Sequence, residues 1–247
     1  MLELYHWEPT ANSGEVLILL HEKGLDYAGR YIDVLKGEQF SPAFLEVNRF
    51  GQVPVLVHDG HTITETGIIL QYLEETFGEV CLTPESAQDR YWAEVWIKYV
   101  NEYMAPAAWK LGVSKAKPAP LPADVLARAP IERQQAWAKT AEGFSDDELE
   151  FAKGLLPVRL ERMEAALASS DWLAGPTYSL ADIAVYPTAA ILPALTPDLV
   201  NAEATPRVLA WLERMASRPA VKAALAEART PDPKAAFAPG PEGGRWG

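Results

Sequence analysis

Two short motifs in the first third of the chain have the residue types of a site for a small anionic peptide. The run Gly51-Gln52-Val53-Pro54 leads into an apolar segment, although proline cannot donate to a β-ladder and keeps the preceding residue extended. We expect a strand entry or a cis bond at Val53-Pro54, which leaves the Val53 N–H and C=O groups free to bind a peptide-like ligand. Farther along, Glu65-Thr66 precedes an apolar helix, whose first N–H groups and dipole can hold a carboxylate.

The hydrophobic spacing around these motifs predicts the elements that position them. Strands are expected at 2–7, 27–34, 54–58 and 61–64, and helices at 13–24 and 66–77, with a short helix opening at Ser41-Pro42. The order β-α-β-α-β-β-α requires a mixed sheet covered by helices. From residue 88 onward only helical periodicity follows, with helices expected at 87–104, 145–169, 183–192, 206–216 and 219–228.

The chain therefore has an α+β pattern in two parts. We expect one domain at 1–80, a linker at 81–88, an all-helical domain at 89–229 and a Pro/Gly-rich, weakly ordered tail at 230–247.

Composition and charge exclude several classes of function. The net charge of −12 argues against nucleic acid as a partner, because such binding depends on Lys and Arg contacts to phosphate. No apolar run approaches the roughly 18 residues of a transmembrane helix, and the first residues lack the pattern of a signal peptide, so a cytoplasmic protein without a membrane partner is expected. Cys81 is the single cysteine, which excludes an internal disulfide, and the four histidines lack metal-ligand spacing, so no metal is expected.

Taken together, the motifs resemble the glutathione S-transferase superfamily over roughly residues 1–228. Four motifs in this order carry the resemblance: Ala11-Asn12-Ser13, Gly51-Gln52-Val53-Pro54, Glu65-Thr66 and the Ser179–Asp182 capping box. The resemblance implies a thioredoxin-like N-terminal domain with a mixed four-stranded sheet, followed by an all-α domain. Family members usually carry serine after the acidic residue, and Thr66 keeps that hydroxyl.

A narrower resemblance is to bacterial β-aryl etherases, which use glutathione to cleave the ether bond of lignin-derived aryl dimers. It rests on Ala11-Asn12-Ser13, Glu22-Lys23-Gly24-Leu25, His58-Asp59-Gly60 following the proline turn, and the insert Pro130–Gln135.

The resemblance implies glutathione as co-substrate and gives several residues a role. Ser13 would donate its hydroxyl to the glutathione sulfur, with Asn12 and Tyr5 as rival donors and a simple helix N-cap as the alternative for Ser13. Lowering the thiol pKa from about 8.5 by two units requires about 2.7 kcal/mol, which one charge-assisted hydrogen bond and a helix N-terminus can supply.

The remaining glutathione contacts follow from the same resemblance. Val53 and Pro54 would hold the cysteinyl unit through the main chain, as an added strand does. Glu65 would bind the γ-glutamyl ammonium and Thr66 its carboxylate. Gln39 and Gln52 would contact the glycyl carboxylate or neighbouring amides, although Phe40 stands where the family often has a basic residue or histidine.

An aromatic acceptor pocket is expected from the helical part. One helical stripe is formed by Trp92, Trp96, Tyr99 and Tyr103, a pattern that is more typical of a core or a dimer interface than of a substrate pocket. Trp109 and Trp137 lie beyond it, and residues 115–122 are either a lid or a surface loop. Asp182 is assigned to folding.

The predicted function is that of a glutathione transferase, as a homodimer by family analogy, which most specifically cleaves β-aryl ethers. A general conjugating transferase and a non-catalytic glutathione-binding protein of the same fold are the alternatives.

Overall fold

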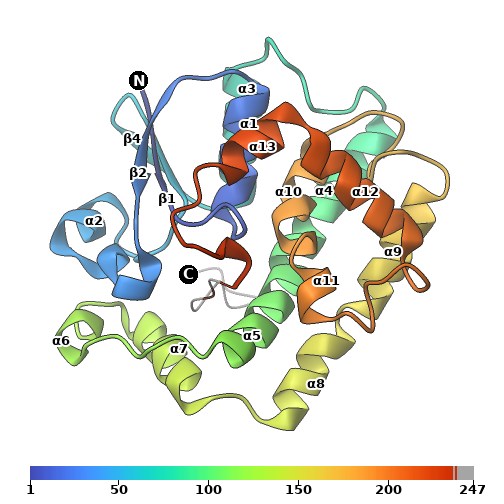
Figure 1. Ribbon diagram of the computed structural model, residues 1–247. Coiled ribbons are helices and arrows are strands. Elements are labelled where there is room, and N and C mark those ends of the chain that lie inside the picture. Colours follow the sequence, from blue (N-terminus) through green and yellow to red (C-terminus); the bar gives the residue numbers. More distant parts are fainter. Residues whose placement is uncertain (236, 238–247) are drawn as a thin grey trace.

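The computed structural model describes residues 1–235 and 237 and contains an N-terminal sheet followed by a helical part (Figure 1). The strands are β1 (Leu2–His6), β2 (Tyr27–Tyr31), β3 (Val55–His58) and β4 (His61–Ile63). The sheet order is β2-β1-β3-β4, in which β1 pairs parallel with β2 and antiparallel with β3, and β3 pairs antiparallel with β4. This is the mixed four-stranded sheet that the sequence predicted.

Three helices accompany the sheet: α1 (Ser13–Glu22), α2 (Pro42–Val47) and α3 (Thr66–Thr76). The segment 16–20 of α1 is wholly apolar and buried, because α1 packs against α3 on one side and against α10 and α13 of the helical part on the other. The N-terminus of α1, which begins directly after the loop from β1, is therefore fixed by the shared core of both parts.

The described residues of the second part form helices and no strand. The helices are α4 (Ala87–Tyr99), α5 (Ala105–Ala116), α6 (Ala123–Leu126), α7 (Ile131–Glu142), α8 (Asp146–Gly154), α9 (Pro157–Leu167), α10 (Leu180–Ala189), α11 (Leu192–Leu195), α12 (Pro206–Ser217) and α13 (Pro219–Leu225). With the sheet before it, this arrangement confirms the predicted fold class. None of the helices among residues 1–235 and 237 is long and apolar enough to cross a membrane.

Several helix boundaries differ from the sequence-based prediction. The helix expected at 87–104 continues through a π-helical turn, Val100–Met104, into α5 and ends only at Ala116. The turn accommodates Pro106 near the start of α5, where the missing proline N–H is tolerated. The single helix expected at 145–169 is instead α8 and α9, because Pro157 cannot continue the hydrogen-bond ladder of α8 and begins a new helix.

The capping box at Ser179 has the folding role that was expected for Asp182. The carboxylate of Asp182 accepts the Leu173 N–H and the indole N–H of Trp211, at 3.0 and 2.9 Å, and also the Ser179 N–H at 3.1 Å. Burial raises the pKa of Asp182 to about 6, whereas these donors act in the opposite direction. The box thereby starts α10, whose residues are all buried.

The tail expected to be weakly ordered packs on the protein in the part that the structure describes. Residues 233–235 form a short 3-10 helix, and Phe237 packs against the main hydrophobic core. In Figure 1 this last segment, drawn in dark red, returns from α13 toward the sheet. Specific contacts hold residues 230–235 and Phe237, whereas residues 236 and 238–247 of the predicted tail lie outside the described part.

Candidate functional site

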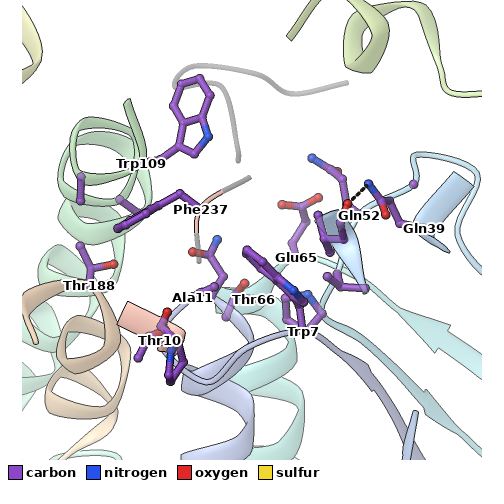
Figure 2. Close-up of a pocket in the computed structure, with 18 of the residues that line it drawn as sticks. Trp7, Thr10, Ala11, Gln39, Gln52, Glu65, Thr66, Trp109, Thr188 and Phe237 are labelled. Atoms are coloured by element: carbon purple, nitrogen blue, oxygen red, sulfur yellow. Dashed lines mark hydrogen bonds between the residues drawn. The ribbon is translucent and has the colours of Figure 1, made fainter. Parts of the chain in front are cut away.

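One cavity lies where the sheet meets the helical part (Figure 2). Its sheet side comes from the loop after β1, the turn before β3 and the start of α3. Its helical side comes from α5, α7, the end of α10 and the last described segment of the chain. The two motifs that the sequence singled out therefore face the same space.

The Val53-Pro54 bond is cis, one of the two conformations that the sequence predicted. Two contacts hold this turn in place. The Asn48 side-chain amide donates to the Gln52 carbonyl at 2.9 Å, and Gly51, with φ +60°, lies close to the Phe40 ring. A Cβ on Gly51 would lie 2.6 Å from that ring, so only glycine fits. In the described part of the chain, no hydrogen bond uses the main-chain groups of Val53, and both Val53 and Pro54 line the cavity.

The start of α3 opens into the same cavity. Glu65 is the N-cap residue, with φ +66°, a conformation that non-glycine residues rarely adopt and that often marks functional sites. The Glu65 side chain makes no capping bond, and its carbonyl accepts the first helical N–H, that of Ile69. Glu65 and Thr66 both line the cavity, so the N–H groups of the first turn and the Thr66 hydroxyl lie beside it.

Asn12 and Ser13 are neighbours in sequence but have different surroundings. Ser13 is 1% exposed, its hydroxyl accepts the main-chain N–H of Trp7 at 2.9 Å, and it is absent from the cavity lining. Asn12 is half-buried, makes no side-chain capping bond and lines the cavity. The third candidate, Tyr5, contacts the Phe44 ring edge-to-face and is also outside the lining.

The two predicted glutamines both line the cavity. Gln39 is buried, and its amide donates to the Val34 carbonyl at 3.3 Å. Its side-chain carbonyl has no partner among the described residues, and a buried acceptor in that condition favours a ligand with an N–H group. Gln52 is held through its main chain by Asn48, which leaves its side chain at the cavity.

Of the six aromatic residues expected in the acceptor pocket, the structure brings only Trp109 to the cavity. Trp96 is fully buried and donates its indole N–H to the Leu173 carbonyl. The guanidinium carbon of Arg159 lies over the Tyr103 ring, 4.3 Å from its centroid. The others outside the lining are Trp92, Tyr99 and Trp137. The stripe packs against α9 and α10, and residues 115–122 add nothing to the lining. Helical periodicity identifies a stripe but not the element that covers it.

Several lining residues carry no recognisable sequence pattern. They include Trp7 and Thr10 from the loop after β1, Arg133 from α7, Ile191, and Phe237 from the last segment. The indole N–H of Trp7 is buried and has no partner in the described part of the chain. Arg133 falls within the Pro130–Gln135 insert, so the insert itself was the one available indication.

Among residues 1–235 and 237, no group of three or more His, Cys, Asp or Glu side chains is arranged to hold a metal ion.

Comparison with known proteins identifies the family. Models of the glutathione S-transferase N-terminal and C-terminal domains match residues 1–75 and 127–219. Protein LigF of Sphingobium sp. strain SYK-6 is 35% identical over 245 residues, covering 94% of this chain and 95% of LigF. Glutathione S-transferase 3 of Zea mays is 31% identical over 243 residues, covering 96% and 99% of the two chains.

A solved structure agrees with the sequence comparison. The crystal structure of the β-etherase LigF superposes with a TM-score of 0.86 and 35% identity, covering 92% of this chain and 99% of that one. The chain that forms this cavity, with its cis-proline turn and open helix start, thus belongs to the glutathione S-transferase family.

Proposed function

We propose that this glutathione transferase cleaves aryl ethers by attack of a glutathione thiolate on the carbon that carries the aryloxy group. One observation carries the proposal: a single cavity joins the free Val53 main chain, the open start of α3 and Asn12 to an apolar wall that includes Trp109. The similarity to a β-etherase over nearly the full length of both chains supports this choice of acceptor.

Glutathione binding is assigned to the sheet side of the cavity. The cysteinyl unit would pair with the Val53 main chain, and the γ-glutamyl carboxylate would accept hydrogen bonds from the first turn of α3 and from Thr66. The Glu65 carboxylate would take the γ-glutamyl ammonium. Gln39 and Gln52 would contact the glycyl end.

Activation of the thiol is assigned to Asn12 rather than to Ser13. The Asn12 amide is at the cavity and can donate to sulfur, and the N-terminus of α1 beside it favours negative charge. The Ser13 hydroxyl is buried, does not line the cavity and accepts the Trp7 N–H, so we assign it the role of holding the loop that presents Asn12. The thiolate form, once stabilised, is the nucleophile.

The proposed reaction balances without an added oxidant or reductant. The thiol first loses its proton to solvent. The thiolate then donates an electron pair to the ether carbon, so that a carbon–sulfur bond forms while the carbon–oxygen bond breaks. The aryloxy group leaves with the bonding pair as a phenolate and is protonated by water. Positioning and thiol pKa are the tasks left to the protein.

A homodimer and the absence of a membrane or nucleic-acid partner complete the proposal. The dimer rests on family analogy alone, and light scattering on the purified chain tests it.

The direct assay incubates the protein with glutathione and a β-aryl ether dimer and follows both products by mass spectrometry. We expect one phenol and one glutathione thioether for each dimer consumed. A panel of halogenated aromatics and epoxides runs in parallel. Turnover of that panel without phenol release would instead favour a general conjugating transferase, and glutathione binding without any turnover would favour a binding protein.

A further inference from the structure

The last described segment of the chain is tied to the loop that carries Asn12. Glu8, which is fully buried, accepts the N–H groups of Arg229 and Thr230, with the Thr230 distance at 3.1 Å. The Thr10 hydroxyl donates to the Pro233 carbonyl. These bonds hold the segment after α13 against the entrance to α1.

Phe237 lies at the end of this segment, over a glycine of α5. A Cβ built on Gly112 would lie 2.2 Å from the edge of the Phe237 ring, so the ring occupies the space that any other residue at 112 would fill. Glycine is unfavourable in the interior of a helix, and Gly112 lies inside α5 without a positive φ that would call for it. The close approach of the Phe237 ring supplies the reason.

Phe237 is also part of the cavity wall. Pro233, Lys234 and Phe237 line the cavity together with Ala108 and Trp109 of α5. Figure 2 shows Phe237 on the same side of the cavity as Trp109 and across from Gln52. The side assigned to glutathione and the side formed by these two aromatic residues are therefore opposite each other.

We propose that Phe237, seated on Gly112, forms the wall against which the aryl ring of the acceptor packs. This inference rests on the proposed function, because it assigns the acceptor end of the same cavity. Phe237 is a specificity-determining residue, since an aromatic wall favours an aromatic group by stacked or edge-on contact. Gly112 acts through Phe237 and is a positioning residue.

The test compares the binding of glutathione and S-benzylglutathione by calorimetry, which needs no turnover. The benzyl group on sulfur reaches from the glutathione side toward the acceptor wall. We expect the unsubstituted chain to bind S-benzylglutathione more tightly than glutathione. Phe237→Ala and Gly112→Ala should each weaken S-benzylglutathione binding by about three- to tenfold, with glutathione affinity unchanged within about twofold.

The double variant Phe237→Ala/Gly112→Ala shows whether the two substitutions weaken S-benzylglutathione binding through the same ring or independently. If the Gly112 substitution acts by displacing the ring, it should add nothing once Phe237 is alanine. Gly154→Ala in α8 is the matched control, because a Cβ there meets no atom within 4 Å, and it should leave both affinities unchanged. Unchanged S-benzylglutathione binding in Phe237→Ala, or additive effects in the double variant, would overturn the inference while leaving the proposed function intact. Failure of the unsubstituted chain to bind glutathione would overturn both.

Discussion

The hydroxyl of Ser13 accepts the main-chain N–H of Trp7 at 2.9 Å, and this buried bond joins the first turn of α1 to the end of β1. The pair fixes the intervening loop, on which Asn12 reaches the cavity. Gly14 contributes to the same fixation, because a Cβ there would lie 1.9 Å from the Pro9 carbonyl oxygen. These contacts favour a structural role for Ser13 beside the site.

Replacing Ser13 by alanine should reduce stability more than turnover per folded molecule. The substitution leaves the Trp7 N–H buried without a partner, which costs about 1–3 kcal/mol of unfolding free energy. Urea denaturation measures this loss. The control is Ser169→Ala, which replaces an exposed serine after α9 and should change the unfolding free energy by no more than about 0.5 kcal/mol. A stable Ser13→Ala protein that has lost its turnover would return the sulfur contact to Ser13.

Replacing Asn12 by alanine should instead reduce turnover and leave stability nearly unchanged. Loss of one hydrogen bond to a thiolate corresponds to about 1.5–3 kcal/mol, and we therefore expect a ten- to hundredfold fall in kcat/KM for the ether dimer. The Asn12 side chain makes no capping bond, so the melting temperature should change little. Asn12→Asp should impair turnover at least as much, because a carboxylate opposes the thiolate. Unaltered turnover in both variants would exclude Asn12.

The hydroxyl of Thr66 offers a test of the γ-glutamyl assignment. Thr66→Val keeps the side-chain shape but removes the donor, and should weaken glutathione binding about tenfold or more. Thr66→Ser keeps the donor and should bind within about twofold of the unsubstituted chain. Calorimetry on the two variants provides the comparison. Equal affinities for the valine and serine variants would contradict the proposed contact.

Glu15 predicts a pH dependence of stability. Burial raises the pKa of this carboxyl well above its usual value, and one of its oxygens has no partner in the described part of the chain. The folded protein therefore holds a proton that the unfolded chain releases above its ordinary pKa, so stability falls as pH rises through that interval.

Glu15→Gln keeps the shape without the ionisation. The variant should be more stable than the unsubstituted chain at neutral pH, and the difference should shrink as the pH falls to about 4.5. Melting temperatures of the variant and the unsubstituted chain, measured from neutral pH to about pH 4.5, test this expectation. A difference that does not vary with pH would show that Glu15 is not protonated in the folded state.

The sequence was informative where the chemistry is local. Val53-Pro54 and Glu65-Thr66 define a turn and a helix start within a few residues each, and both reach the cavity as expected. Pro157 shows where the prediction of helix boundaries failed, because the apolar spacing continues through the break between α8 and α9 at which Pro157 begins the new helix.

The acceptor side was harder to predict because it depends on contacts between distant segments. Trp96 and Trp109 belong to one continuous helical stretch, yet only Trp109 faces the cavity, since α10 and the Leu173 carbonyl cover Trp96. Phe237 lay in a segment whose composition indicated disorder, and only the fold brings it to Gly112. No spacing rule connects the two.

If this cavity binds glutathione and stabilises its thiolate through Asn12, the bound thiol should ionise at a lower pH than the free thiol. The most direct measurement is the ultraviolet absorbance of the thiolate in the protein–glutathione complex, titrated against pH, for the unsubstituted chain and for Asn12→Ala. We expect a bound thiol pKa about two units below the free value of about 8.5, and a return toward that value in the variant. A bound thiol that titrates like free glutathione in the unsubstituted chain would contradict this expectation.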